Sequence, residues 1–147
     1  MSLPPEHRTR IKICGLTREA DVDAAVAAGA DAIGFVVYEK SPRYVTAARA
    51  GELARRLPPY VTPVVLLVNA SAELHAQVLR AVPHALIQFH GDETPAQCEA
   101  VGRPYVRAAR MAPGFDLLDF ALSYPSAQAM LVDAHVEGYG GGGKVFD

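Results

Sequence analysis

The strongest indication of the fold class is the segment Ile-Gly-Phe-Val-Val at residues 33–37. It is an almost continuous apolar run, and Val-Val-Leu-Leu-Val at 64–68 repeats the pattern. Strands that are covered on both faces have this composition, as in a parallel sheet with helices outside it. The two runs therefore predict buried parallel strands.

Further β-branched runs extend this pattern in both directions, and Ala- and Leu-rich amphipathic segments separate them. The centres of the runs are about 24 residues apart on average, the length of one strand-plus-helix unit. We expect strands at 10–14, 31–37, 62–68, 85–89, 105–108 and 129–133. We expect helices at 17–28 with Thr17 as cap and Gly29 as stop, at 47–57 after Thr46, at 72–81 after Ser71, after a capping box that begins at Thr94, and at 114–122.

Repeated strand-helix units allow two architectures, an open doubly wound sheet and a closed barrel of eight units. A barrel of eight units at this spacing needs about 190 residues, so a length of 147 residues favours the open sheet. The sequence motifs described below favour the barrel.

Composition narrows the function classes. Half of the residues are apolar, a fifth are charged and the formal net charge is −2, which is typical of a globular domain with one core. The balance of charges offers no basic field, so we expect no nucleic-acid partner. The longest apolar stretch, 61–68, is far shorter than a membrane span, so we expect no membrane partner. Two cysteines cannot form a disulfide framework, and a reducing cytoplasm is the expected compartment.

Polar residues begin where the apolar strands end. Cys14 and Gly15 lie at the end of the first run, Arg43 lies beyond the second, His90 follows the fourth, the fifth leads to Arg107, and Asp133 closes the sixth. Active sites in both architectures lie beyond the carboxyl ends of the strands. These residues are therefore among the candidates for a site.

Four of these candidates have both a structural and a functional interpretation. Cys14 is either a buried small residue or a thiolate base or nucleophile. Asp133 is either a turn former or, in an apolar pocket, a proton donor near neutral pH. Arg43 is either a solvated loop residue or the partner of a carboxylate through two hydrogen bonds. His90 is a base, a ligand or a packed core histidine.

Lys12 is expected on the same face of the first strand as Cys14, because residues two apart in a strand share a face. If Cys14 points into a barrel, Lys12 does so one layer deeper. The alternative is a rotated strand that places Lys12 at the surface.

Two further patterns could indicate a cofactor. The glycine run at 138–144 imitates a phosphate loop, but Val145 stands where serine or threonine holds magnesium, so we expect a mobile loop over the mouth of the site. His90, Asp92, Asp133 and His135 are metal-ligand types without a metal-ligand spacing. We therefore expect neither a nucleotide-binding loop nor a metal site from these two patterns.

Taken together, several stretches resemble the phosphoribosylanthranilate isomerase family. They are KICGLT at 12–17, GADAIGF at 29–35, SPRYV at 41–45, QFHGDE at 88–93, LVD at 131–133 and YGGGGKVFD at 139–147. They occur in that family's order and spacing and cover essentially the whole chain. The resemblance implies a TIM (β/α)8-type barrel and a cofactor-free Amadori rearrangement of a phosphosugar, N-(5′-phosphoribosyl)anthranilate, in tryptophan biosynthesis.

The resemblance also implies roles for the candidates. The family's general base falls on Cys14, its general acid on Asp133 and the arginine that meets the anthranilate carboxylate on Arg43. We count His90 and Gly15 with the substrate-binding residues.

The sequence departs from the family in two places. Gly142 stands where the family usually has threonine, so the loop is expected to be more mobile. Nothing in 1–147 matches the family's strands seven and eight, whose following loops bind the substrate phosphate. We therefore expect one barrel domain over 1–147 that is incomplete at its C-terminal side, with about six strands and five helices, after a flexible extension at 1–9.

Three explanations fit this difference in length. The chain is part of a longer one, another chain supplies the rest, or the family has given rise to a smaller non-enzymatic unit; we favour the first. Unpaired edges on the first and last strands invite association, which is compatible with a homo-oligomer. We expect residues 1–147 alone to be inactive or nearly so, since the phosphate anchor holds the sugar in register. Turnover by a verified 147-residue chain would contradict this.

Two rival functions remain open at this stage. One is a metal-dependent sugar-phosphate epimerase or hydrolase on a related barrel, which chelators would inhibit. The other is a non-catalytic open α/β binding module, in which Cys14 and Asp133 lie too far apart to share a ligand.

Overall fold

Six strands alternate with five helices in the computed structural model, which describes residues 8–137, 139, 143 and 145. All six expected strands and all five expected helices are confirmed, with shifts at their ends. In chain order they are β1 (Lys12–Cys14), α1 (Glu19–Ala27), β2 (Ala32–Val36), α2 (Ala47–Ala54), β3 (Thr62–Leu67), α3 (Ala72–Ala81), β4 (Leu86–Phe89), α4 (Pro95–Ala100), β5 (Tyr105–Met111), α5 (Leu117–Leu122) and β6 (Ala129–Ala134).

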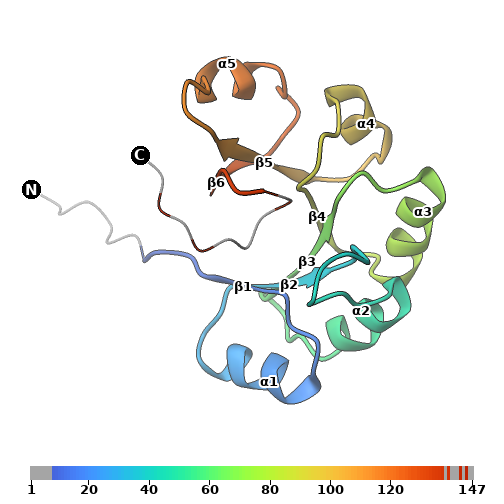
Figure 1. The fold of residues 1–147 in the computed structure, drawn as a ribbon. Coiled ribbons are helices and arrows are strands. Elements are labelled where there is room, and N and C mark those ends of the chain that lie inside the picture. The colour runs from blue at the N-terminus through green and yellow to red at the C-terminus, as the bar shows by residue number, and fades with distance from the viewer. Residues whose placement is uncertain (1–7, 138, 140–142, 144, 146–147) are drawn as a thin grey trace, which may run out of the picture.

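The strands form one parallel sheet in the order β1-β2-β3-β4-β5-β6. A doubly wound sheet reverses its strand order at a switch point, and this sheet does not. Figure 1 shows the strands following one another along an arc, with the helices on its outer side. The open sheet favoured by length is therefore wrong, and the architecture is a half-barrel of the TIM type.

Two apolar clusters occupy the two faces of this curved sheet. Residues such as Phe35, Leu67 and Phe89 point outward and form the main core with the helices. Residues of opposite parity, Val36 and Leu66, point inward and form a small second cluster. The alternation follows from the two-residue period of a strand. The polar candidates that alternate in step with Val36 and Leu66 therefore also lie on the inner face.

Coverage of the outer face stops at the two end strands. Ile13 on β1 and Val132 on β6 are each more than a third exposed, whereas the central strands are buried on both faces. The expectation of two-sided burial therefore holds for the middle of the sheet only, because the helices pack outside β2 to β5.

Helix caps explain where most of the helices begin. The side chains of Thr46, Ser71 and Thr94 each accept a hydrogen bond from a backbone N–H three residues later, as expected. The prediction for α1 is wrong, because Arg18 occupies the cap position without a side-chain cap, and its guanidinium pairs with Asp21 instead.

The fifth strand is longer than its apolar pattern indicates. It continues to Met111 rather than ending at residue 108. Arg107 pairs in register with Phe89 and shares its outward-facing side of the sheet. Its buried guanidinium donates hydrogen bonds to the carbonyl groups of Phe89 and Gly91 and lies against the rings of Phe120 and Tyr124. Arg107 is therefore a packed structural cation and not a strand-end residue of the site.

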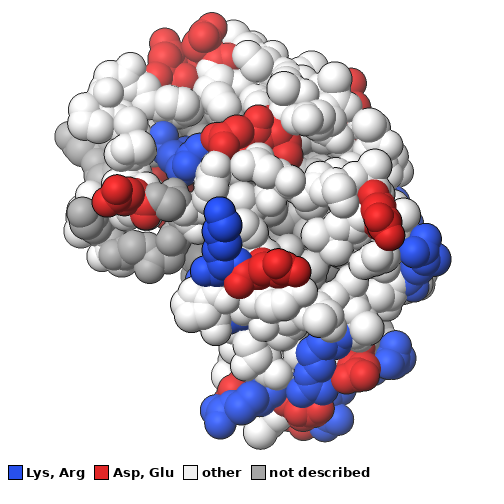
Figure 2. Space-filling model, turned by 45° about the vertical axis from the view of Figure 1, so that its right-hand side comes forward, with Lys and Arg blue, Asp and Glu red and all other residues white. Residues whose placement is uncertain are grey.

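Surface charges of opposite sign lie side by side. On the face shown in Figure 2, Lys and Arg are interspersed with Asp and Glu rather than gathered in a field of one sign. Arg56 pairs with Asp23 and Arg49 pairs with Glu19. At the N-terminal side, Arg8 pairs with Asp31, while 1–7 of the expected flexible extension lie outside the described residues. Within the described part of the chain, no helix is long and apolar enough to cross a membrane.

Candidate active site

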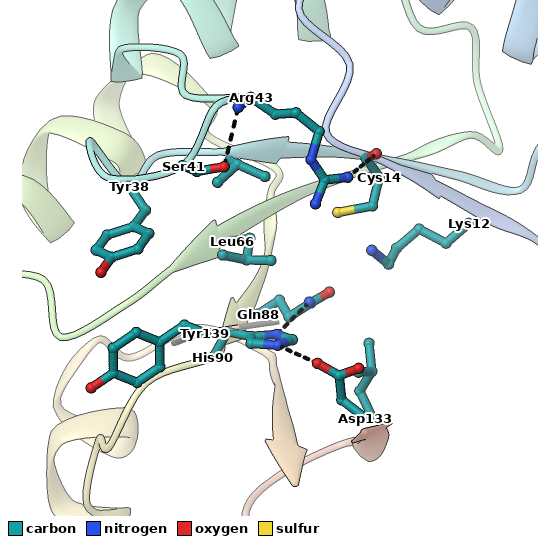
Figure 3. Close-up of a pocket in the computed structure, with 12 residues that line it drawn as sticks. Lys12, Cys14, Tyr38, Ser41, Arg43, Leu66, Gln88, His90, Asp133 and Tyr139 are labelled. Atoms are coloured by element: carbon teal, nitrogen blue, oxygen red, sulfur yellow. Dashed lines mark hydrogen bonds and ion pairs between the residues drawn. The ribbon is translucent and has the colours of Figure 1, made fainter. Parts of the chain in front are cut away.

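A cavity of about 190 Å³ opens on the inner face of the sheet, at the carboxyl ends of the strands. Figure 3 shows the side chains around it. Cys14 from β1 and Asp133 from β6 both line it, although these strands lie at opposite ends of the sheet. The lining residues are Lys12, Cys14, Val36, Tyr38, Ser41, Arg43, Leu66, Gln88, His90, Leu131, Asp133 and Tyr139.

Cys14 points inward because its partner on β2 leaves room for the sulfur. Its Cα pairs in register with that of Gly34, and a Cβ added to Gly34 would lie 2.8 Å from the Cys14 Sγ. Lys12 also lines the cavity, as the parity of the strand predicts. The alternative of a rotated strand with Lys12 at the surface is thereby excluded.

Arg43 reaches the site from the loop after β2 and crosses Gly15. Its Nη1 donates a hydrogen bond of 3.1 Å to the carbonyl oxygen of Cys14. Gly15 has a φ of +83°, and a Cβ there would lie 2.5 Å from that same Nη1. Only glycine meets both conditions without strain, so Gly15 makes room for the guanidinium.

His90 lies between two polar side chains. It is 6% exposed, its Nε2 lies 3.0 Å from Oδ2 of Asp133, and its Nδ1 lies 3.1 Å from Nε2 of Gln88. Burial lowers the pKa of His90 below its ordinary value, with further lowering from the charges of Arg110 and Lys12, while Asp133 acts in the opposite direction. The ring is therefore held toward its neutral form.

Asp133 is oriented from two sides. Oδ2 faces the ring of His90, and Oδ1 accepts a 2.9 Å hydrogen bond from the backbone N–H of Ala134. The carboxyl group is partly exposed, so it is fixed in direction yet open to a ligand in the cavity.

Tyr139 is the described residue of the glycine run that reaches the cavity. Its ring lies edge-on to Tyr38, and its hydroxyl donates a hydrogen bond to Asp92. That bond is the first cause of a lowered pKa at Asp92. Positions 138, 140–142 and 144 lie outside the described residues. The expected mobility of this loop and the expected effect of Gly142 therefore stay predictions.

The metal-ligand types considered above do not gather around one point. His135 is exposed and lines a separate cavity with Asp92, away from His90 and Asp133. Among the residues that the structure describes, no three His, Cys, Asp or Glu side chains form a group that could hold a metal ion.

Gln88 is a site residue that the sequence analysis did not select. It is 2% exposed and lines the cavity. The signal was present, because Gln88 is a polar residue inside an apolar strand, two positions before His90 and hence on the same face. Tyr38, which follows β2, and Leu66 on β3 were missed as well, since aromatic and aliphatic residues in or next to a strand do not stand out from the core.

The two cysteines should differ sharply in reactivity. Cys98 is fully buried, and burial raises the pKa of its thiol to about 11, whereas Cys14 is partly exposed at the cavity. Because the thiolate is the reactive form, we expect iodoacetamide at pH 7.5 to alkylate Cys14 and to spare Cys98, as measured by peptide mass mapping. Alkylation of Cys98 in the folded protein would contradict this packing.

The buried histidines predict that the protein loses stability in mild acid. Burial lowers the pKa of both His90 and His75 in the folded protein. Below pH ~6.5 these two side chains therefore bind protons more readily in the unfolded chain than in the folded one. The free energy of unfolding should therefore fall as the pH drops from 7.5 to 5.5. Urea unfolding at several pH values measures it, and His75→Gln should flatten the curve. His84→Gln, an exposed control, should not; equal slopes for both variants would contradict the account.

Comparison with known proteins places this arrangement in context. A family model described as N-(5′phosphoribosyl)anthranilate (PRA) isomerase matches residues 11–147. An N-(5′-phosphoribosyl)anthranilate isomerase of Leptothrix cholodnii is 74% identical over 140 residues, which is 95% of this chain and 64% of that protein. One from Methylibium petroleiphilum is 72% identical, over 95% of this chain and 66% of its own length. The chain thus spans slightly less than two thirds of these relatives.

Solved structures agree with the sequence relatives. The phosphoribosyl anthranilate isomerase of Thermotoga maritima superposes with a TM-score of 0.82 at 34% identity, covering 95% of this chain and 68% of that one. A second such isomerase, solved in complex with reduced 1-(o-carboxyphenylamino)-1-deoxyribulose 5-phosphate, has a TM-score of 0.77 at 32% identity, covering 87% and 66%.

Proposed function

Because the chain belongs to the N-(5′-phosphoribosyl)anthranilate isomerase family, we propose that the protein carrying it converts N-(5′-phosphoribosyl)anthranilate to 1-(2-carboxyphenylamino)-1-deoxyribulose 5-phosphate in tryptophan biosynthesis. The observation that carries this proposal is that Cys14 and Asp133, from opposite ends of the sheet, line one cavity. The ligand of the solved relative, a reduced form of that product, supports the same class of substrate.

Asp133 is the proposed general acid of the first step. Its carboxyl group gives a proton to the ring oxygen of the ribose as the bond between C1′ and that oxygen breaks. The lone pair of the anthranilate nitrogen moves into a C1′=N bond, which produces an open-chain cationic imine and an Asp133 carboxylate. The hydrogen bonds from His90 and from the Ala134 N–H stabilise the charge that develops on this carboxylate.

Cys14 is the proposed general base of the second step. The cationic imine acidifies the hydrogen on C2′, and the thiolate of Cys14 removes it. The freed electron pair forms the C1′=C2′ bond, the C=N pair returns to nitrogen, and a neutral enolamine results. Loss of the enol proton and protonation at C1′ then give the ketone. The proton gained by the thiol balances the proton lost by Asp133 over the cycle.

Arg43 and Gly15 are proposed to bind the aromatic end of the substrate. The guanidinium lies over Gly15 at the edge of the cavity, and one of its donors is used by the Cys14 carbonyl. The others are positioned for the anthranilate carboxylate. Both ring nitrogens of His90 already have partners, so we propose that it supports substrate binding through Asp133 rather than by direct contact.

The proposal extends to the ligand, the compartment and the oligomeric state. The proposed ligand is a phosphosugar. The proposed compartment is the reducing cytoplasm, with which the free thiols of both cysteines agree. A second copy of the chain is a further candidate partner, since one solved structure is described as generated monomers of a dimeric isomerase, that of Thermotoga maritima.

The direct test is turnover by the protein at its natural length. Incubation with N-(5′-phosphoribosyl)anthranilate should convert the anomeric C1′ to a methylene carbon and C2′ to a ketone carbon in the ¹³C NMR spectrum, without a change in mass. A parallel sample with excess EDTA should react at the same rate. Absence of the ketone would refute the proposal, and loss of turnover with EDTA would favour the metal-dependent epimerase or hydrolase instead.

A further inference from the structure

Gln88 is a buried polar residue of the cavity lining to which the mechanism above gives no role. It lies on β4, two residues before His90, and points to the inner face of the sheet, as Figure 3 shows. Gln88 is 2% exposed and its side-chain Nε2 lies 3.1 Å from Nδ1 of His90. On the other side of the ring, Nε2 of His90 lies 3.0 Å from Oδ2 of Asp133. The three side chains form a continuous chain that ends at the cavity.

The donors and acceptors of this chain permit one arrangement once Asp133 is ionised. An ionised carboxylate only accepts hydrogen bonds, so the Nε2 of His90 must carry a hydrogen and donate it to Asp133. A neutral imidazole has one donor and one acceptor, so Nδ1 is then the acceptor. The amide NH₂ of Gln88 is a donor and matches this acceptor, whereas its oxygen would not.

Charges around the ring favour this neutral form. Lys12 on β1 and Arg110 on β5 both face His90 with positive charge, and Asp133 on β6 is the opposing carboxyl group. Burial of the ring acts in the same direction as the two cations. Gln88 adds no charge. Its NH₂ group donates a hydrogen bond to Nδ1 of His90 and offers that nitrogen no acceptor for a hydrogen of its own.

We propose that Gln88 is a positioning residue that keeps the hydrogen of His90 on Nε2, so that the proton of Asp133 is delivered to the substrate. With the hydrogen on Nδ1 instead, the bare Nε2 would accept the proton of Asp133 and draw it away from the cavity. The Nε2–H also stabilises the carboxylate that forms when Asp133 gives up its proton. The catalytic part of this inference rests on the proposed role of Asp133, but the position of the hydrogen on His90 does not.

Histidine ring NMR tests the position of the hydrogen without any turnover. In protein labelled with ¹⁵N-histidine at pH 7.5, the His90 signals are identified by their loss in His90→Gln. The expected result is an unprotonated Nδ1 and a protonated Nε2. A hydrogen on Nδ1, or a charged ring, would overturn the inference whatever the activity of the protein.

Two substitutions test the consequence for catalysis. Gln88→Met keeps the length of the side chain and removes the donor, and Gln88→Glu offers Nδ1 an acceptor and should move the hydrogen there. We expect kcat to fall about 10- to 100-fold in both, because the hydrogen bond from Nε2 of His90 to the charged Asp133 carboxylate is no longer secured, with KM within about twofold. In Gln88→Glu, the NMR spectrum should show a hydrogen on Nδ1.

The matched control is Gln77, which is exposed on α3. Gln77→Met and Gln77→Glu should leave kcat and the His90 signals unchanged. Unchanged kcat in a folded Gln88→Met would overturn the positioning role while leaving the proposed isomerase function intact. Inactivity of the unsubstituted protein at its natural length would refute the proposed function alone, since the NMR result would stand. If neither Gln88 variant folds, the spectrum of the unmodified protein still decides where the hydrogen lies.

Discussion

Replacing Cys14 by alanine should reduce kcat by about 10²- to 10⁴-fold, the usual contribution of a positioned general base. The thiol is the proposed base for the C2′ hydrogen, and it points into the cavity through the space that Gly34 leaves open. Alanine keeps the strand and its pairing with β2, so the protein should fold normally. Steady-state turnover together with circular dichroism measures both quantities.

The second cysteine provides the control for this experiment. Cys98→Ala removes a fully buried thiol on α4, so it should lower the free energy of unfolding and leave kcat nearly unchanged. Full activity in Cys14→Ala would remove the base assignment. A similar loss of kcat in both variants would show that the effect comes from stability.

Replacing Asp133 by asparagine should cause a loss of the same order, about 10²- to 10⁴-fold in kcat. Asparagine is nearly the same size as aspartate but has a single acceptor oxygen, so it loses the transferable proton and can accept only one of the two hydrogen bonds, from His90 and from Ala134, that the two carboxyl oxygens of Asp133 receive. Asp23→Asn, on the exposed face of α1, is the matched control. Rates from the ¹³C assay check the prediction, and full activity of Asp133→Asn would assign the acid to another group.

Much of the fold could be predicted because strands and helices carry their own local signals. The apolar runs around Phe35 and Leu67 predicted buried strands, and the caps at Thr46, Ser71 and Thr94 lie where they were expected. The architecture could not be obtained from length. Curvature of the sheet comes from the pairing of successive strands, and no single strand encodes it.

The site was predicted in part, for a reason that lies in strand geometry. Cys14, Arg43, His90 and Asp133 follow apolar strands and line one cavity, as the common edge of a parallel sheet requires. Arg107 was selected by the same pattern but belongs to the outer layer, because it pairs in register with the outward-facing Phe89 and packs against Phe120. Parity along a strand therefore separates site residues from core residues better than proximity to a strand end.

The central claim is that Cys14 and Asp133 act on one sugar from two sides. A crystal structure of the protein at its natural length, with reduced 1-(o-carboxyphenylamino)-1-deoxyribulose 5-phosphate bound, tests it most directly. We predict the Cys14 sulfur about 3 to 3.5 Å from C2′ and the Asp133 carboxyl group within hydrogen-bond distance of the hydroxyl at C4′. A complex in which either side chain faces away from the ribulose chain, or in which the ligand lies outside this cavity, would contradict the account.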